Sequence, residues 1–184
     1  MNIGIIIAVI IAIVLVVAVV SYNKLVRQRI MVEEAFSTMD IYLKKRFDLI
    51  PNLVETVKGY AKHEESTLEE IVGLRSDNYS GMSVEEKLEN SNAISRVIPK
   101  IMALAEAYPE LKANENFTQL SGQLERLEND IANARKYYNG AVRQYNISVQ
   151  SVPTNLIAGA FRFETKPMYE IEDTQQRANV EVKF

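Results

Sequence analysis

The chain of 184 residues contains no cysteine, no tryptophan and a single histidine, His63. The lack of cysteine excludes disulfides, thiol nucleophiles and cysteine-ligated zinc. One histidine cannot supply a paired Glu-x-x-His di-iron centre or an H-E-x-x-H zinc site, and no phosphate-binding glycine motif occurs. The charged neighbours of His63 indicate a solvated helix face. We therefore expect no catalytic residue, no metal site and no cofactor.

Glycine and proline are also scarce, and neither occurs between Gly4 and Pro51. Within that stretch, residues 3–20 read IGIIIAVIIAIVLVVAVV and carry no charge. A helix of that length covers about 27 Å, close to the thickness of a bilayer's hydrocarbon core. The alternative, a signal peptide, lacks a basic start and a small-residue cleavage site. Residues 1–21 are therefore predicted to be an uncleaved transmembrane anchor.

Charge predicts how the anchor is oriented. No Lys or Arg precedes the apolar run, whereas Lys24, Arg27 and Arg29 follow it. Because positive flanks stay in the cytoplasm, we expect a single-pass protein of the inner (cytoplasmic) membrane. Its N-terminus would lie outside and the following domain inside, with Lys24 and Arg27 contacting lipid headgroups. The net charge of −3 predicts no nucleic-acid partner.

Beyond residue 20 the apolar residues recur at helical spacing. The first helix is predicted to continue from the anchor to about Arg46, and a second to begin near Asp48. Ser83 and Glu86 form a capping box that opens a third helix, which ends near Pro109. A fourth helix carries a coiled-coil-like apolar stripe, made of Phe117, Leu120, Leu124, Leu127, Ile131, Ala134, Tyr138, Ala141 and Tyr145.

Four long helices with short connections predict an all-α fold, a long antiparallel up-down bundle. The transmembrane helix is expected to be continuous with the first bundle helix. Residues 22–153 would form the bundle. Residues 154–184, which mix apolar clusters with Gly, Pro and charges, would form a partly irregular tail that packs on it.

The stretch KKRFDLIPNLVETVKGYAKHE, residues 44–64, is interpreted as a corner between two helices. Asp48 would cap the second helix, and Pro51 would lie in its first turn, where a missing N–H is harmless. The basic residues would end the first helix, where cations oppose its dipole. Arg46 would pair with Asp48 or Asn52 across the turn.

The pair Tyr138-Asn139 recurs seven residues later as Tyr145-Asn146, which places all four side chains along one side of a helix. One interpretation is that the tyrosines belong to the bundle core and their hydroxyls reach polar groups. The other is a polar seam that receives a partner helix or the C-terminal tail. The sequence leaves both open.

Several segments of the chain match motifs of one known family. They are residues 22–75, 107–117 (AYPELKANENF), 134–146 (ARKYYNGAVRQYN), Pro153 with 158–163 (AGAFRF), and 180–184 (VEVKF). Together they resemble the LemA family of bacterial membrane proteins, although Phe36 stands where the family usually has Trp. The resemblance implies one N-terminal transmembrane helix, an antiparallel helical bundle and no assigned enzymatic activity. It also implies relatives involved in magnetosome formation and genes that lie near membrane-protease genes.

We therefore expect a non-enzymatic, membrane-anchored scaffold or adaptor. Its partners would be the lipid bilayer and either itself or other membrane proteins, a membrane protease among them, with no small-molecule substrate. A self-assembling protein that shapes membranes is the alternative. An enzyme that binds a hard metal through carboxylates such as Glu125 and Glu128 is a third, less favoured one.

Overall fold

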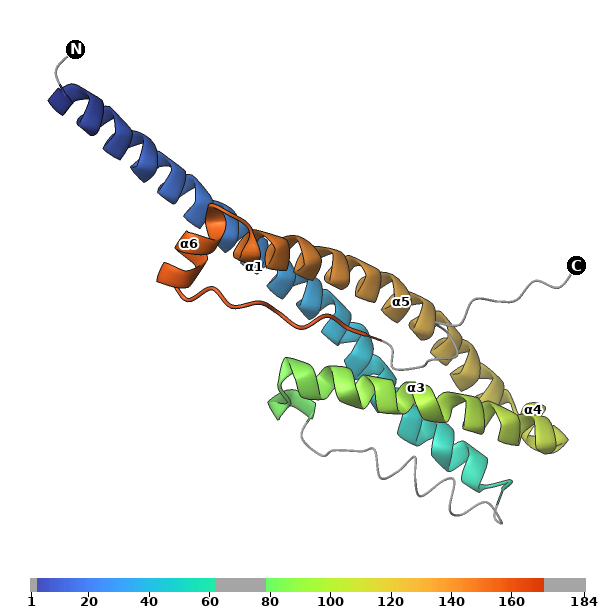
Figure 1. The fold of residues 1–184 in the computed structure, drawn as a ribbon. Helices are drawn as coiled ribbons and strands as arrows, with labels where there is room; N and C mark the ends of the chain where they lie inside the picture. The colour runs from blue at the N-terminus through green and yellow to red at the C-terminus, as the bar shows by residue number, and fades with distance from the viewer. Residues whose placement is uncertain (1–2, 62–78, 171–184) are drawn as a thin grey trace, which may run out of the picture. The chain divides into compact units, whose positions relative to one another are not determined.

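The computed structural model describes residues 3–61 and 79–170, and these ranges contain helices and no strand. The predicted all-α bundle is confirmed (Figure 1). The elements are α1 (Ile3–Lys58), η1 (Tyr79–Gly81), α3 (Val84–Ala107), α4 (Pro109–Lys112), α5 (Glu115–Gln150) and α6 (Thr154–Ala160).

Helix α1 is a single helix of 56 residues, and this corrects one prediction. It does not end at Arg46, and Asp48 caps no second helix, because α1 continues through Pro51 to Lys58. A proline inside a helix costs about 3 kcal/mol. Beyond Arg46, however, the helix buries Ile50, Leu53, Val54 and Val57, and each such side chain contributes roughly 1.5–3 kcal/mol. Burial therefore outweighs the proline.

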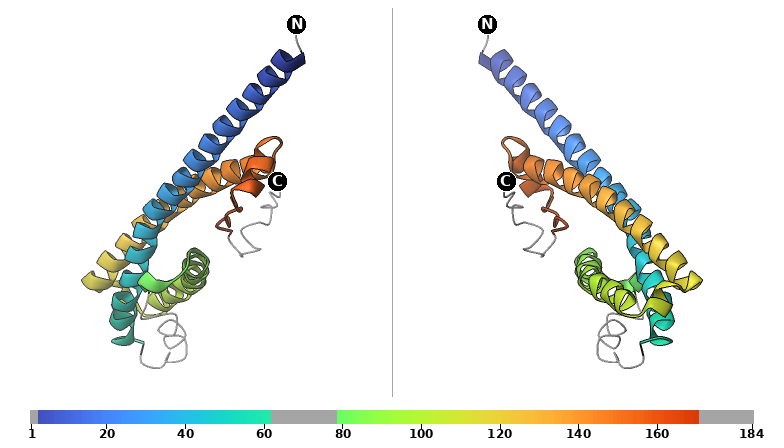
Figure 2. Two further views of the ribbon diagram at one scale, coloured as in Figure 1. Left: turned by 90° about the vertical axis from the view of Figure 1, so that its left-hand side faces the viewer. Right: turned by 90° about the vertical axis from the view of Figure 1, so that its right-hand side faces the viewer.

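The chain forms two compact units, each built from segments distant in the sequence. The first combines Met1–Met39 with Ala134–Met168. There α1 and α5 lie side by side and antiparallel (Figures 1 and 2). Their buried residues include Leu25, Val32, Ala35 and Met39 on α1 and Tyr138, Val142 and Tyr145 on α5.

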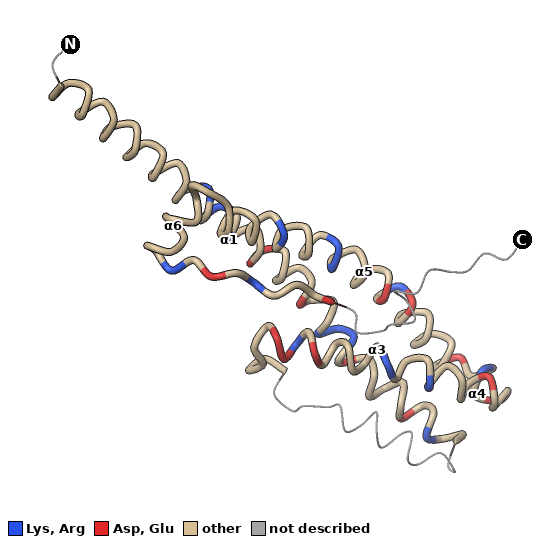
Figure 3. The backbone as a smooth tube through the Cα atoms, in the orientation of Figure 1, with Lys and Arg blue, Asp and Glu red and all other residues tan. Residues whose placement is uncertain are grey.

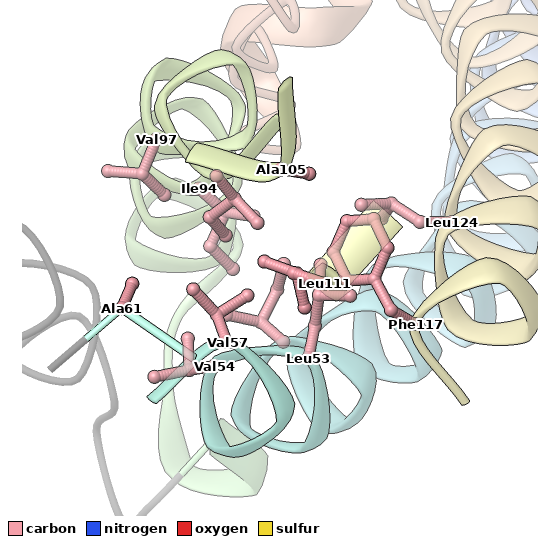
Figure 4. Close-up of a cluster of buried hydrophobic side chains, with 12 residues drawn as sticks. Leu53, Val54, Val57, Ala61, Ile94, Val97, Ala105, Leu111, Phe117 and Leu124 are labelled. Carbon is pink, nitrogen blue, oxygen red and sulfur yellow. The ribbon is translucent and has the colours of Figure 1, made fainter. Parts of the chain in front are cut away.

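The second unit combines Asp40–Asn133 with Tyr169–Phe184. Its apolar core lies among α1, α3, α4 and the beginning of α5 (Figure 4). The predicted domain boundaries after residues 21 and 153 do not coincide with these units and stay predictions. The core residues are Ile50, Leu53, Val54, Val57, Ala61, Ile94, Val97, Ile101, Ala105, Leu111, Phe117 and Leu124.

Local polar contacts fix where the later helices begin. At the start of α3 the Ser83 hydroxyl accepts a hydrogen bond from the Glu86 N–H, and the Glu86 carboxylate accepts one from the Ser83 N–H at 2.6 Å. The bond from the Ser83 N–H to the carboxylate lowers the pKa of Glu86. Helix α3 continues through Pro99, and Asn114 Oδ1 accepts a hydrogen bond from the Phe117 N–H at 3.0 Å at the start of α5.

Candidate functional site

A buried guanidinium lies at the centre of the second unit. Arg46 is only 1% exposed. Its Nη1 donates to the two carboxylate oxygens of Glu128 at 2.9 and 3.1 Å and to Ser95 Oγ at 3.0 Å. Its Nη2 donates to the Ser91 carbonyl at 2.8 Å and to the Ser91 hydroxyl, which in turn lies 2.7 Å from Tyr169 Oη. One arginine thereby joins α1, α3, α5 and the segment after α6.

Because burying a charge is costly, a buried arginine needs a counter-charge and several acceptors. Glu128 supplies the charge and the serines supply the acceptors. The predicted pairing of Arg46 with Asp48 or Asn52 is wrong, since no turn separates them in α1. Asp48 instead accepts a hydrogen bond from Lys44 at 2.7 Å, and the Asn52 carbonyl accepts one from Thr56 Oγ1.

The sequence did carry a sign of this buried arginine. Met39, Leu43, Arg46, Ile50 and Leu53 recur at steps of four and three, and all five are buried. Arg46 therefore lies on the apolar face of α1, whereas its basic neighbours made the whole cluster look like a helix end. Ser91, Glu128 and Tyr169 were not predicted as its partners.

A second polar cluster of this unit surrounds Tyr79, which is 6% exposed. Its hydroxyl donates to Asp40 at 2.8 Å, and Lys87 forms an ion pair with the same carboxylate at 2.7 Å. Burial and the Asp40 carboxylate raise the pKa of the Tyr79 hydroxyl. The Lys87 and Lys44 ammonium groups lie 5.0 and 5.7 Å from the centre of the Tyr79 ring, a cation–π distance. The cluster joins α1 to the start of α3.

A groove of about 380 Å³ runs between α1 and α5 in the second unit. Two predicted corner residues, Asp48 and Asn52, lie on its wall. Leucines make the apolar part, and charges of both signs surround them. A site of this mixed character suits a protein surface better than a small ionic ligand. It is lined by Lys45, Asp48, Leu49 and Asn52 from α1 and by Gln123, Arg126, Leu127 and Asp130 from α5.

In the first unit the predicted seam on α5 contacts the chain that follows α6. Tyr138 and Tyr145 are each 1% exposed. Tyr138 Oη donates to the Pro167 carbonyl at 2.8 Å. Asn146 Nδ2 donates to the Lys166 carbonyl at 2.8 Å, and its Oδ1 accepts from the Lys166 N–H at 2.9 Å. Burial raises the pKa of Tyr145. Asn139 is half-buried beside them.

The amide of Asn146 pairs with the Lys166 backbone as a neighbouring strand would. It thereby satisfies both polar groups of a residue outside any helix. The seam holds a part of this chain, residues 166–167.

Lys24 and Arg27 are exposed on α1 just beyond residues 3–20. This placement is compatible with headgroup contact, which stays a prediction. His63 lies outside the described residues. Within residues 3–61 and 79–170, no three His, Cys, Asp or Glu side chains are grouped so as to hold a metal ion.

Helix α1 is long and apolar enough to cross a membrane, and no residue of its most hydrophobic stretch is buried. Figure 3 shows that this first part of α1 carries no charged residue, whereas both signs are interspersed over the later helices. The fold is thus that of an all-helical protein with one candidate membrane-spanning helix.

The sequence model of the LemA family matches residues 35–184, so the chain belongs to the LemA family. It is 25% identical to Protein LemA of Metamycoplasma hominis, over 74% of this chain and 63% of that protein. It is 21% identical to Magnetosome proteins MamQ 2 and MamQ 1 of Paramagnetospirillum magneticum, over 74% of this chain and 60% of each. The chain spans about three fifths of the length of these relatives. Family and apolar helix together indicate a membrane-associated protein.

Proposed function

We propose that this protein is a non-enzymatic scaffold or adaptor, anchored by residues 3–20 in the cytoplasmic membrane. The observation that carries the proposal is the continuity of α1. One helix begins in the apolar run and then contributes buried residues to both compact units. A partner bound to either unit would therefore be tethered to the bilayer.

The orientation follows from the charges that flank the apolar run. Since Lys24 and Arg27 follow it, the N-terminus lies outside and the bundle in the cytoplasm. A cysteine introduced in place of exposed Lys112, in a chain without cysteine, tests this. A membrane-impermeant maleimide should label it only after the spheroplasts are permeabilised. Labelling in intact spheroplasts would mean that the bundle lies outside the cytoplasm and the N-terminus inside.

The groove between α1 and α5 is the proposed partner surface, since it combines apolar and charged side chains and holds no part of the described chain. Its occupant would be a second copy or another membrane protein, a membrane protease among them.

Cross-linking in living cells tests the partner surface. A thiol-reactive photo-cross-linker attached to Asn52→Cys lies in the groove. The same reagent on Glu89→Cys, on the exposed face of α3, is the matched control. Asn52→Cys should give one dominant adduct that Glu89→Cys does not. A foreign protein in that adduct would identify the partner of an adaptor. Identical weak adducts from both variants would argue against the groove.

The names of two relatives favour a second candidate. They are magnetosome proteins, which supports a self-assembling protein that shapes a membrane. Self-adducts from Asn52→Cys, together with deformed vesicles after reconstitution, would favour this candidate. Round vesicles that hold monomeric protein would count against it.

A further inference from the structure

Large apolar side chains are exposed on the short helix α6 and directly beside it, at one end of the first unit. Val152, Leu156 and Phe161 are 79%, 70% and 60% exposed. These are the highest values among large apolar side chains in the described part of the chain after residue 20. Such a patch on a water-facing surface indicates a binding surface.

The local structure holds this patch in an outward position. Thr154 and Ala158, one helical turn apart, are buried, so Leu156 between them points away from the unit. The Phe163 N–H donates to the Ala158 carbonyl at 2.9 Å and closes the helix around Arg162, which has a φ of 55°. This is the hydrogen bond of a Schellman-type helix end.

Aromatic contacts place the patch beside the membrane-spanning segment. The Tyr22 ring on α1 lies 4.8 Å from the Phe161 ring and 5.8 Å from the Phe163 ring, measured between centroids. Tyr22 is two residues beyond Val20, an axial rise of about 3 Å. The patch and the end of the apolar run therefore lie at the same level within this unit, where Tyr typically sits at the bilayer interface.

The charges agree with this placement. No charged residue occurs between Arg143 and Arg162. Two exposed cations, Lys24 and Arg27, lie on α1 within two helical turns of Val20. An apolar surface flanked by Lys and Arg is typical of helices that lie in the membrane interface.

We propose that the segment from Val152 to Phe161 is a second membrane contact. It lies flat in the interface and inserts Val152, Leu156 and Phe161 among the outer parts of the acyl chains. This second contact presupposes the membrane anchor of the proposed function. The patch then needs no protein partner, because it continues the apolar surface of residues 3–20.

Tryptophan fluorescence tests this, since the chain contains no Trp. Full-length Leu156→Trp is reconstituted in vesicles of phosphatidylcholine and phosphatidylglycerol, with or without bromine on the upper acyl chains. Tyr137→Trp is the matched control, because it is also exposed, at 57%, but lies on α5 far from α6 along the helix. Brominated lipid should quench Leu156→Trp and leave Tyr137→Trp unchanged, whereas aqueous iodide should do the reverse.

Quenching of Leu156→Trp by iodide but not by brominated lipid would overturn the proposal. So would protection from both quenchers, because a second copy of the chain would then cover the patch. If Leu156→Trp loses helical circular dichroism, Phe161→Trp, which keeps an aromatic ring, takes its place. Val14→Trp distinguishes failure of the second contact from failure of the anchor. If brominated lipid quenches Val14→Trp but not Leu156→Trp, residues 3–20 enter the bilayer and only the second contact is rejected.

Discussion

Arg46 illustrates how one residue's surroundings decide its role. Lys44 and Lys45 stand beside it in the sequence and carry the same charge, yet Arg46 alone lies on the buried face of α1. Its fork of N–H groups contacts a carboxylate, a carbonyl and two hydroxyls. Lysine has no such planar fork and would not reproduce the set. The buried charge therefore depends on Glu128, which is 36% exposed at its side chain.

Glu128→Gln should lower the free energy of unfolding by about 2 kcal/mol, because it leaves the buried guanidinium without a counter-charge. Glu125→Gln, an exposed position on the same helix, should change it by less than about 0.5 kcal/mol. Denaturant unfolding followed by circular dichroism measures both. Equal effects would mean that Arg46 does not need the charge of Glu128.

Among the helices, α1 differs most from what the sequence predicts. The sequence predicted its length up to Arg46 and its continuity with the anchor, because no Gly or Pro interrupts it. The sequence then predicts a second helix that begins near Asp48, with Pro51 in its first turn. The apolar spacing continues through Ile50, Leu53 and Val57, and such packing overrides a single proline.

Pro51→Ala distinguishes a continuous helix from a corner. In a continuous helix it should stabilise the protein by about 1–3 kcal/mol, since alanine restores the N–H and removes the ring clash. Asp48→Ala should change the free energy of unfolding by less than about 0.5 kcal/mol, because the exposed ion pair of Asp48 with Lys44 contributes little to stability. Destabilisation by both substitutions would instead support a corner between two helices.

At the seam on α5, the sequence predicted the face that Tyr138 and Asn146 share but left its occupant open. Heptad spacing places side chains on a face, whereas the path of residues 161–170 depends on contacts that no local pattern encodes. The same holds for α6, whose seven residues carry too few apolar positions to define a period.

Asn146→Ala should speed hydrogen exchange at the Lys166 N–H, because it removes the acceptor of that N–H. Asn129→Ala is the control, because the Asn129 side chain donates to the Glu125 carbonyl of its own helix. Exchange monitored by mass spectrometry on peptides covering residues 161–170 reports the difference. Equal protection in both variants would show that Asn146 does not hold this segment.

At the scale of the whole molecule, residues 3–20 form a segment that is long and apolar enough to cross a membrane. The apolar run is exposed along α1, so its apolar surface has no protein to cover it within the described residues. The composition alone predicts a transmembrane segment here, because eighteen uncharged residues leave few alternatives.

Val14→Arg should reduce the membrane-inserted fraction, since arginine at the centre of a spanning helix costs about 2.5–3.5 kcal/mol. Val14→Leu should leave insertion unchanged. Extraction of membranes at alkaline pH separates inserted from released protein. Full retention of Val14→Arg would mean that residues 3–20 do not span the bilayer.

The contacts of Arg46 also have an order in time, because the ribosome makes the chain from its N-terminus. When α1 emerges, the arginine has no partner. Its neutral acceptors, Ser91 and Ser95, are synthesised next. Its counter-charge, Glu128, follows only with α5. Tyr169, which is hydrogen-bonded to Ser91, is synthesised last. Arg46 therefore stays a third cation beside Lys44 and Lys45 through most of synthesis, and its burial awaits the second half of the chain.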